Sequence, residues 1–178
     1  MSTPLSSSSF IIEELKDEHT LEVLAMLDDP SPSIYNYFSV SAMMTDVDLV
    51  PYGLRDASTG RLLAVLVVSP WASAYLCKEL RDVPDIRQLL RYYEKVAYIA
   101  LLWVRDGHRR MGYARHLITH AINEMRDLPT AEPRLLFALV PSLNTAAVGA
   151  FHRMGFGCYA TIPRVPGHQA AHTWFNET

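Results

Sequence analysis

The second half of the chain alternates apolar runs with helical segments, and this pattern restricts the fold more than any other feature. Residues 97–104 and 135–140 are apolar enough to form buried strands. Between them, residues 112–126 carry apolar side chains at the spacing of a helix that buries one face. These positions are Ala114, Leu117, Ile118, Ala121, Ile122 and Met125. Strands that alternate with helices predict an α/β (α+β) domain around one mixed sheet.

Turn and capping residues divide the rest of the chain into shorter elements. Further strands are predicted at 10–15, 48–56, 61–69, 158–162 and 172–175, and further helices at 17–27, 34–44 and 142–154. Ser142 is the predicted N-cap of the last helix, and Gly155 is placed to end it. Segment 71–93 is long for a connection between two strands, which favours a functional role.

Length and charge restrict the class of protein. The 178 residues suit a single domain, which we expect to span residues 10–178, and the serine-rich residues 1–9 are expected to be a disordered tail. The net charge of −3 excludes a protein-wide basic field, so neither nucleic acid nor an anionic membrane is an expected partner. No apolar run approaches the roughly 20 residues that a membrane-spanning helix needs.

The cysteines and the N-terminal residues indicate the compartment. Cys77 and Cys158 are too few for a disulfide framework and are not spaced as a metal site. The first residues lack the basic start and apolar run of a signal peptide. We therefore expect a cytoplasmic protein with reduced thiols. A homodimer is compatible with these features.

A glycine-containing loop follows the strand 97–104 and leads into the amphipathic helix. Its residues Arg109–Ala114 read Arg-Arg-Met-Gly-Tyr-Ala. The first N–H groups of a helix have no intrahelical partner, and the helix dipole makes that end positive. Gly112 lets an anion approach these N–H groups closely, and Arg109 and Arg110 can add charge-assisted hydrogen bonds. The pattern favours a diphosphate ligand, with an ordinary strand–turn–helix as the alternative.

Two common nucleotide-binding motifs do not match this loop. The Gly-Lys-Ser/Thr ending of an ATP-binding loop is absent, and the single Gly112 replaces the three spaced glycines of a dinucleotide-binding fingerprint. The segment Val104–Ala114 instead resembles the cofactor-binding signature of the GNAT superfamily of N-acetyltransferases. In that signature a strand ending in Val and a short turn precede Arg/Gln-x-x-Gly-x-Gly/Ala.

A second segment resembles another signature of the same superfamily. It is Asn144-x-x-Ala147-x-x-x-Phe151-x-x-x-Gly155-Phe156. The two segments follow one another in the family's order, with one helix and one strand between them. Together they cover roughly residues 97–157.

The resemblance implies a GNAT-like fold, a mixed central sheet of about six to seven strands flanked by helices and splayed between its fourth and fifth strands. It implies acetyl-CoA (acyl-CoA) as co-substrate, no metal, and direct attack of a primary amine on the thioester. The backbone of Val104 would stabilise the oxyanion. The implied cofactor-binding residues are Leu102, Trp103, Val104, Arg109, Arg110, Met111, Gly112, Tyr113, Ala114, Asn144 and Phe151.

The chain departs from the family pattern at two positions that bear on proton transfer. Phe151 stands where the family often has a Tyr that protonates the leaving thiolate, and Tyr98 stands where some members place a Glu base. Tyr98 can relay a proton through water, but a phenol with a pKa of ~10 is a poor base at neutral pH. A non-enzymatic acyl-CoA binder and a regulatory module on the same fold therefore remain alternatives.

A pair of histidines and two aromatic residues are further candidates for a site. His116 and His120 are four residues apart on one helix, but no third ligand is evident, so a solvated helix face is predicted in place of a metal site. Trp71 and Tyr75 are the predicted acceptor-binding residues, because their segment joins two strands beside the predicted site. The acceptor is expected to be a small-molecule or peptide amine whose identity the sequence does not specify.

Overall fold

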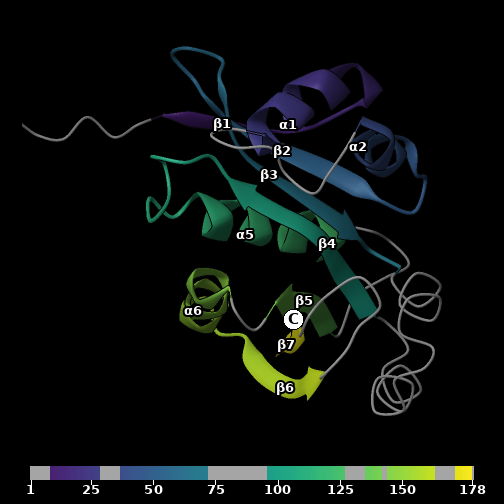
Figure 1. The fold of residues 1–178 in the computed structure, drawn as a ribbon, viewed down its shortest axis with the longest axis vertical. Helices are drawn as coiled ribbons and strands as arrows, with labels where there is room; N and C mark the ends of the chain where they lie inside the picture. Colours follow the sequence, from purple (N-terminus) through teal and green to yellow (C-terminus); the bar gives the residue numbers. More distant parts are fainter. Residues whose placement is uncertain are drawn as a thin grey trace, which may run out of the picture.

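The computed structural model describes residues 9–28, 37–71, 96–126, 135–141, 144–162 and 171–177 (Figure 1). Its strands are β1 (Phe10–Glu14), β2 (Val50–Asp56), β3 (Leu62–Ser69), β4 (Val96–Val104), β5 (Leu135–Pro141), β6 (Gly157–Ile162) and β7 (Ala171–Glu177). Its helices are α1 (Thr20–Leu27), α2 (Tyr37–Thr45), α5 (Tyr113–Arg126) and α6 (Thr145–Arg153), with a 3₁₀ turn, η1, at Asp17–His19. Each lies within a few residues of its predicted bounds. None of these helices is long and apolar enough to cross a membrane.

The described strands form one seven-stranded sheet in the order β1-β2-β3-β4-β5-β7-β6. Every neighbouring pair is antiparallel except β4 and β5, which are parallel. Helices α1 and α2 lie on one face of the β1–β4 half, and α5 lies on the other face (Figure 1). The predicted mixed sheet flanked by helices is confirmed.

The sheet separates between β4 and β5. Their ladder joins only Val96–Ile99 to Leu135–Ala138. Strand β4 continues to Val104 along β3, whereas β5 continues along β7. The second half of β4, residues 100–104, therefore has β3 on one side and none of the described strands on the other, as the predicted splay requires.

A β-bulge lies where the pairing of β4 with β5 ends. Val67 of β3 pairs with Leu101, whereas the next residue, Val68, pairs with Ile99. Ala100 is therefore an extra residue on β4. A bulge of this kind bends the strand and increases its twist, which fits the separation of β4 from β5 at this point.

The bulge changes which side chains of β4 share a face. Ile99 and Leu102 both pack in the core on the α5 side, although three positions separate them. The two residues between them, Ala100 and Leu101, both pack on the α1–α2 side. Side chains of an unbroken strand alternate between faces. The bulge therefore shifts this alternation by one residue in the open half of β4.

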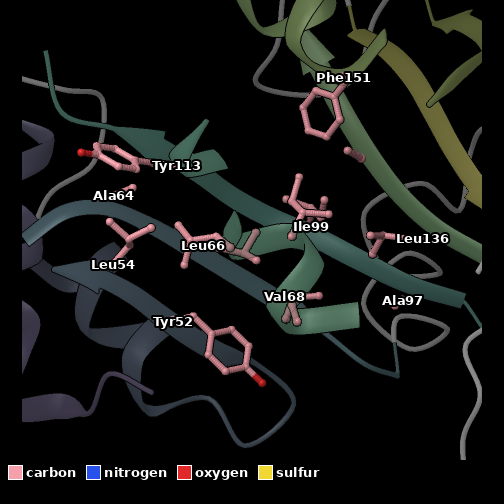
Figure 2. Packing of buried hydrophobic residues seen from close by; sticks show 14 of the residues in the cluster. Tyr52, Leu54, Ala64, Leu66, Val68, Ala97, Ile99, Tyr113, Leu136 and Phe151 are labelled. Carbon is pink, nitrogen blue, oxygen red and sulfur yellow. The ribbon is translucent and has the colours of Figure 1, made fainter. Parts of the chain in front are cut away.

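Two apolar cores cover the two faces of the sheet. On one face, α5 and α6 pack against β2–β5, and Leu66, Ile99 and Leu136 from three neighbouring strands lie in this core (Figure 2). On the opposite face, α1 and α2 pack against β3 and β4 around buried residues such as Met26 and Val65.

Helix α6 begins at an asparagine cap and ends at a glycine. Asn144, rather than the predicted Ser142, is the N-cap, because its Oδ1 accepts a hydrogen bond from the Ala147 N–H at 3.1 Å. Gly155 follows the helix with a φ of 90°, and the Phe156 N–H donates to the Phe151 carbonyl at 3.1 Å. This left-handed ending confirms the predicted stop at Gly155.

The first described residue, Ser9, is hydrogen-bonded to the residue that follows β2. The Ala57 N–H donates to the Ser9 carbonyl at 3.0 Å, so hydrogen bonding reaches the last residue of the predicted tail. The rest of that tail, residues 1–8, lies outside the described residues, as do residues 72–95 of the long connection.

Arg55 on β2 links β1, β2 and α1. Its two terminal nitrogens donate to the two carboxylate oxygens of Glu22 at 2.6 and 2.7 Å, and its Nε donates to Glu13. Nη1 also donates to the Gly60 carbonyl in the β2–β3 turn at 3.0 Å. A bidentate arginine–carboxylate pair fixes orientation as well as distance, so Arg55 holds α1 in register with the edge of the sheet.

Glu22→Gln should lower the free energy of unfolding at pH 7 by about 1 kcal/mol, because it weakens a charge-assisted pair that solvent partly screens. The side-chain hydrogen bond from Arg55 lowers the pKa of Glu22 below its ordinary value of 4.5. The stabilisation is therefore complete above that value and is lost as the pH falls through the lowered pKa. Urea unfolding at pH 7 and about pH 3 should show the difference between wild type and variant shrinking at the lower pH.

Glu18→Gln is the matched control, since Glu18 is exposed on the turn before α1. It should change the free energy of unfolding by less than half as much. An equal loss from both variants at both pH values would show that the Arg55 pair does not hold α1.

Candidate active site

The open half of β4 presents backbone groups to the gap beside β5. The Arg105 N–H donates to the Leu63 carbonyl of β3 at 2.8 Å. Backbone groups of successive strand residues point to alternate sides, so Trp103 also faces β3. Leu102 and Val104 therefore direct their N–H and C=O groups into the gap. Of the three predicted β4 residues, these two are the ones whose backbone can pair with an extended ligand.

Arg105 fixes the loop that follows β4. Besides its backbone bond to β3, its buried side chain donates from Nε to the Leu62 carbonyl at 3.0 Å. The His108 N–H donates to the Arg105 carbonyl at 3.1 Å, which closes a turn. Arg109 pairs with Asp106 at 3.1 Å, and both side chains are about half exposed. The loop is thus attached to the sheet through a residue that the sequence did not single out.

The loop reaches the helix through two residues with left-handed backbone. Arg110 has a φ of 68° and Gly112 a φ of 84°. Side chains other than glycine rarely adopt this conformation, and it concentrates at functional sites. Alternating right- and left-handed residues turn successive N–H groups toward one point and form an anion-binding concavity. The side chain of Met111, between them, is 59% exposed.

Helix α5 begins with N–H groups that have no partner. The His116 N–H makes the first bond of the helix, to the Gly112 carbonyl at 3.0 Å. Among the described residues no acceptor is found for the N–H groups of Tyr113, Ala114 and Arg115. The Tyr113 side chain is buried beside the Phe10 ring, with centroids 6.1 Å apart, so this residue anchors the helix while its backbone stays free for a ligand.

These observations together test whether the loop suits a diphosphate. Unpaired N–H groups, the positive end of the α5 dipole and the left-handed residues are all directed to one place. A Cβ added to Gly112 would approach only the His116 imidazole, at 3.9 Å, so space is open beside the backbone. The arrangement fits an anion of this size.

The α6 side of the gap carries the two predicted cofactor-binding residues of the second motif, Asn144 and Phe151. The Asn144 side chain caps α6 through its oxygen, which leaves its amide NH₂ group to donate elsewhere. Phe151 is buried in the α5-side core, and its ring meets Phe156 edge to face with centroids 4.9 Å apart. In Figure 2 the Phe151 ring extends from α6 toward Ile99 of β4.

Tyr98 lies on the other face of the sheet. It is 6% exposed, and its ring lies 6.0 Å from that of Phe137 on β5. Because Ile99 faces α5, its neighbour Tyr98 faces away from α5. The two residues considered for proton transfer, Tyr98 and Phe151, therefore occupy opposite faces of β4.

The remaining candidate residues have simpler surroundings. Trp71 is 46% exposed just beyond the end of β3, and Tyr75 lies outside the described residues. His116 contacts the Phe10 ring, with centroids 4.6 Å apart, and His120 contacts the Tyr52 ring at 5.1 Å. Within the described ranges, no group of three or more metal-ligating side chains is found.

Burial, with the charges of Glu124 and Glu14, raises the pKa of Tyr52 to about 12. This phenol is neutral at physiological pH and is no candidate for a base. His120, which contacts it, packs against a neutral ring.

Sequence reasoning missed the bulge at Ala100 and the buried Nε1 of Trp103, for which the described part of the chain offers no hydrogen-bond partner. Both lie within a continuous apolar run, which carries no local signal for either feature.

The comparisons with known proteins agree with the resemblance of the two motifs. A sequence model described as the acetyltransferase (GNAT) family matches residues 48–156, which is more than half of the chain.

The chain belongs to the GNAT acetyltransferase family. Comparison with curated protein sequences gives no significant match. Arabidopsis thaliana NAA60 in complex with acetyl-CoA has a similar fold, with a TM-score of 0.72 and 17% identity over 95% of this chain and 98% of that chain.

Two bacterial structures are also similar. The Escherichia coli ribosomal-protein-S18-alanine N-acetyltransferase has a TM-score of 0.67 and 14% identity over 95% of this chain and 94% of that chain. A variant of the Vibrio cholerae SpeG spermidine N-acetyltransferase has a TM-score of 0.64 and 13% identity over 96% of this chain and 95% of that chain. At these identities the likeness establishes the GNAT fold.

Arg110→Gly should raise the stability of this GNAT protein while weakening its affinity for CoA. Glycine removes the steric cost of the left-handed conformation, a gain of about 0.5–1 kcal/mol in the free energy of unfolding. It also removes a cation beside the predicted diphosphate site, so the Kd for CoA should rise about threefold or more. Thermal unfolding and titration calorimetry measure the two effects separately.

Arg109→Gly is the matched control. Arg109 lacks a positive φ and its guanidinium pairs with Asp106, so its removal should give no stabilisation. A lower midpoint of unfolding for Arg110→Gly, with CoA affinity unchanged, would contradict the assignment of strain and charge to this loop.

Proposed function

We propose that this protein transfers the acetyl group of acetyl-CoA to a primary amine by direct attack on the thioester. One observation carries the proposal. A short loop, residues 105–112, joins the unpaired N–H groups at the start of α5 to a strand whose open half offers further unpaired backbone groups. Such a continuous track suits a ligand with a diphosphate at one end and an amide-containing arm at the other.

Different residues would bind different parts of the cofactor. The backbone of Arg109–Ala114, with Arg110 as the nearby cation, would hold the diphosphate. The backbone of Leu102 and Val104 would pair with the pantetheine arm along the gap. Asn144 and Phe151 would contact the arm from the α6 side. The bound cofactor supplies an activated acetyl thioester.

The open half of β4 would also lower the barrier to attack. An N–H group fixed by the strand can stabilise the negative charge that develops on a carbonyl oxygen during acyl transfer. Val104 is our assigned donor, because its N–H faces the gap. The donor is preorganised, since β4 is held to β3 on its other side.

Proton transfer from the amine would take place on the face of the sheet opposite α5. An amine attacks only when neutral, so its ammonium form must first lose a proton. Tyr98 would relay that proton through water from the face opposite α5. Phe151 supplies no acid, and a thiolate, whose conjugate acid has a pKa of ~8.5, leaves without strong help.

The similar structures indicate the class of acceptor only in general terms. Their titles name an alanine N-acetyltransferase and a spermidine N-acetyltransferase, so we propose a peptide or small-molecule amine. Trp71 would line the acceptor pocket from the end of β3, together with Tyr75. An acyl-CoA binder without transfer activity is the second candidate, because the chain has Phe151 in place of a Tyr acid.

Release of free CoA from acetyl-CoA with a panel of amines tests the proposal, and Gly112→Asp is the decisive variant. The added carboxylate would stand beside the diphosphate site, so CoA affinity should fall at least tenfold, about 1.4 kcal/mol. Turnover at subsaturating acetyl-CoA should fall with it. Gly60→Asp is the matched control, because Gly60 has a similar φ of 69° in the β2–β3 turn.

Three results are informative. Equal CoA affinity in the two aspartate variants would refute the diphosphate site. CoA binding by the wild type without thiol release from any amine would establish the binder. Release with at least one amine, lost in Gly112→Asp and kept in Gly60→Asp, would support the transferase.

A further inference from the structure

We infer that the acceptor is an amine with a neighbouring carbonyl oxygen, such as a peptide N-terminus or an amino-acid amide, and that the indole N–H of Trp103 binds this oxygen. The inference rests on the proposed function and specifies its acceptor. It starts from a polar atom in the described part of the chain that has no partner.

Trp103 lies on the open half of β4. Its backbone pairs with Val65 of β3, and its partly buried side chain packs against the core on the α1–α2 face. Its Nε1 is buried and has no hydrogen-bond partner. Buried polar groups in folded proteins are almost always satisfied, so this atom marks a place where a partner is missing.

The chemistry of the missing partner is restricted. An indole N–H can only donate. Its partner must therefore be an acceptor. The Trp103 carbonyl is engaged in the ladder with β3, and those of Leu102 and Val104 point into the gap, in the plane of the sheet. A carbonyl oxygen brought by a ligand fits, whereas a polyamine in its ammonium form offers only donors.

The Trp103 side chain and α5 lie on opposite faces of the sheet, so an acceptor at Trp103 would be on the other face from the diphosphate of the cofactor. The predicted diphosphate loop continues into α5, which packs on the opposite face of the sheet. The pantetheine arm would lie in the plane of the sheet, along Leu102 and Val104. An acceptor bound at the open half of β4 on the α1–α2 face would lie beside the Trp103 side chain and on the same face as Tyr98.

A second buried polar atom provides an internal control. The Ser69 Oγ, on β3 opposite Tyr98, also has no hydrogen-bond partner. Ser69 pairs with the part of β4 that is closed by β5, away from the open half. Removing this hydroxyl should affect all acceptors alike.

The kinetic test compares an alanyl peptide with a simple alkylamine of similar size, both with saturating acetyl-CoA. Trp103→Phe keeps an aromatic ring and removes the donor. The ratio of kcat/KM for the peptide to that for the alkylamine should fall about tenfold. Ser69→Ala should leave this ratio within about twofold. An unchanged ratio in Trp103→Phe would overturn the inference.

A spectroscopic test does not depend on turnover. The chain has three tryptophans, and loss of one indole signal in Trp103→Phe assigns the Trp103 N–H in ¹⁵N-labelled protein. In wild type saturated with CoA, the alanyl peptide should move this proton signal downfield, and the alkylamine should not. A shift with CoA alone, or equal shifts with both amines, would overturn the inference.

The two tests separate this inference from the proposed function. If no amine is acetylated and the peptide still moves the indole signal, the carbonyl-binding site at Trp103 stands and the transferase proposal fails. If both amines are acetylated, with an unchanged ratio in Trp103→Phe and no peptide-specific shift, the transferase stands and the inference is wrong.

Discussion

The pairing between β4 and β5 ends at Ile99, and the rest of the candidate site depends on that limit. A strand in the middle of a sheet normally has both rows of backbone groups bonded, which leaves nothing for a ligand. Here the bulge at Ala100 bends β4 away while β3 keeps holding its other side. The result is a strand in the middle of the sheet that keeps one row of unpaired donors and acceptors.

The loop after β4 completes this track through backbone conformation more than through charge. Arg105 attaches the loop to β3, and the left-handed residues Arg110 and Gly112 turn the chain so that α5 begins directly beside it. The two arginines of the motif differ in role, because Arg109 is paired with Asp106 and Arg110 adopts the strained conformation. A protein with a net charge of −3 can therefore present a local anion site without a basic surface.

Periodicity predicted the elements well, and the family resemblance predicted their assembly. The apolar spacing of 112–126 identified α5, and the two motifs indicated the GNAT fold that the family match confirms. Single-residue detail was less predictable. Ser142 was the wrong cap, because Asn144 has the same capping chemistry and makes the bond to Ala147. The bulge was invisible because it lies in a uniformly apolar run, and with it the face on which Tyr98 lies.

The central claim is that the open half of β4 and the first turn of α5 hold the cofactor together. Amide hydrogen exchange, resolved by residue with and without CoA, tests it most directly, because unpaired N–H groups exchange quickly until a ligand bonds them. The account predicts that CoA slows exchange at Leu102, Val104, Tyr113 and Ala114, while the β3-facing amide of Trp103 changes little. Protection that appears elsewhere in the chain, with these four amides unchanged at saturating CoA, would contradict it.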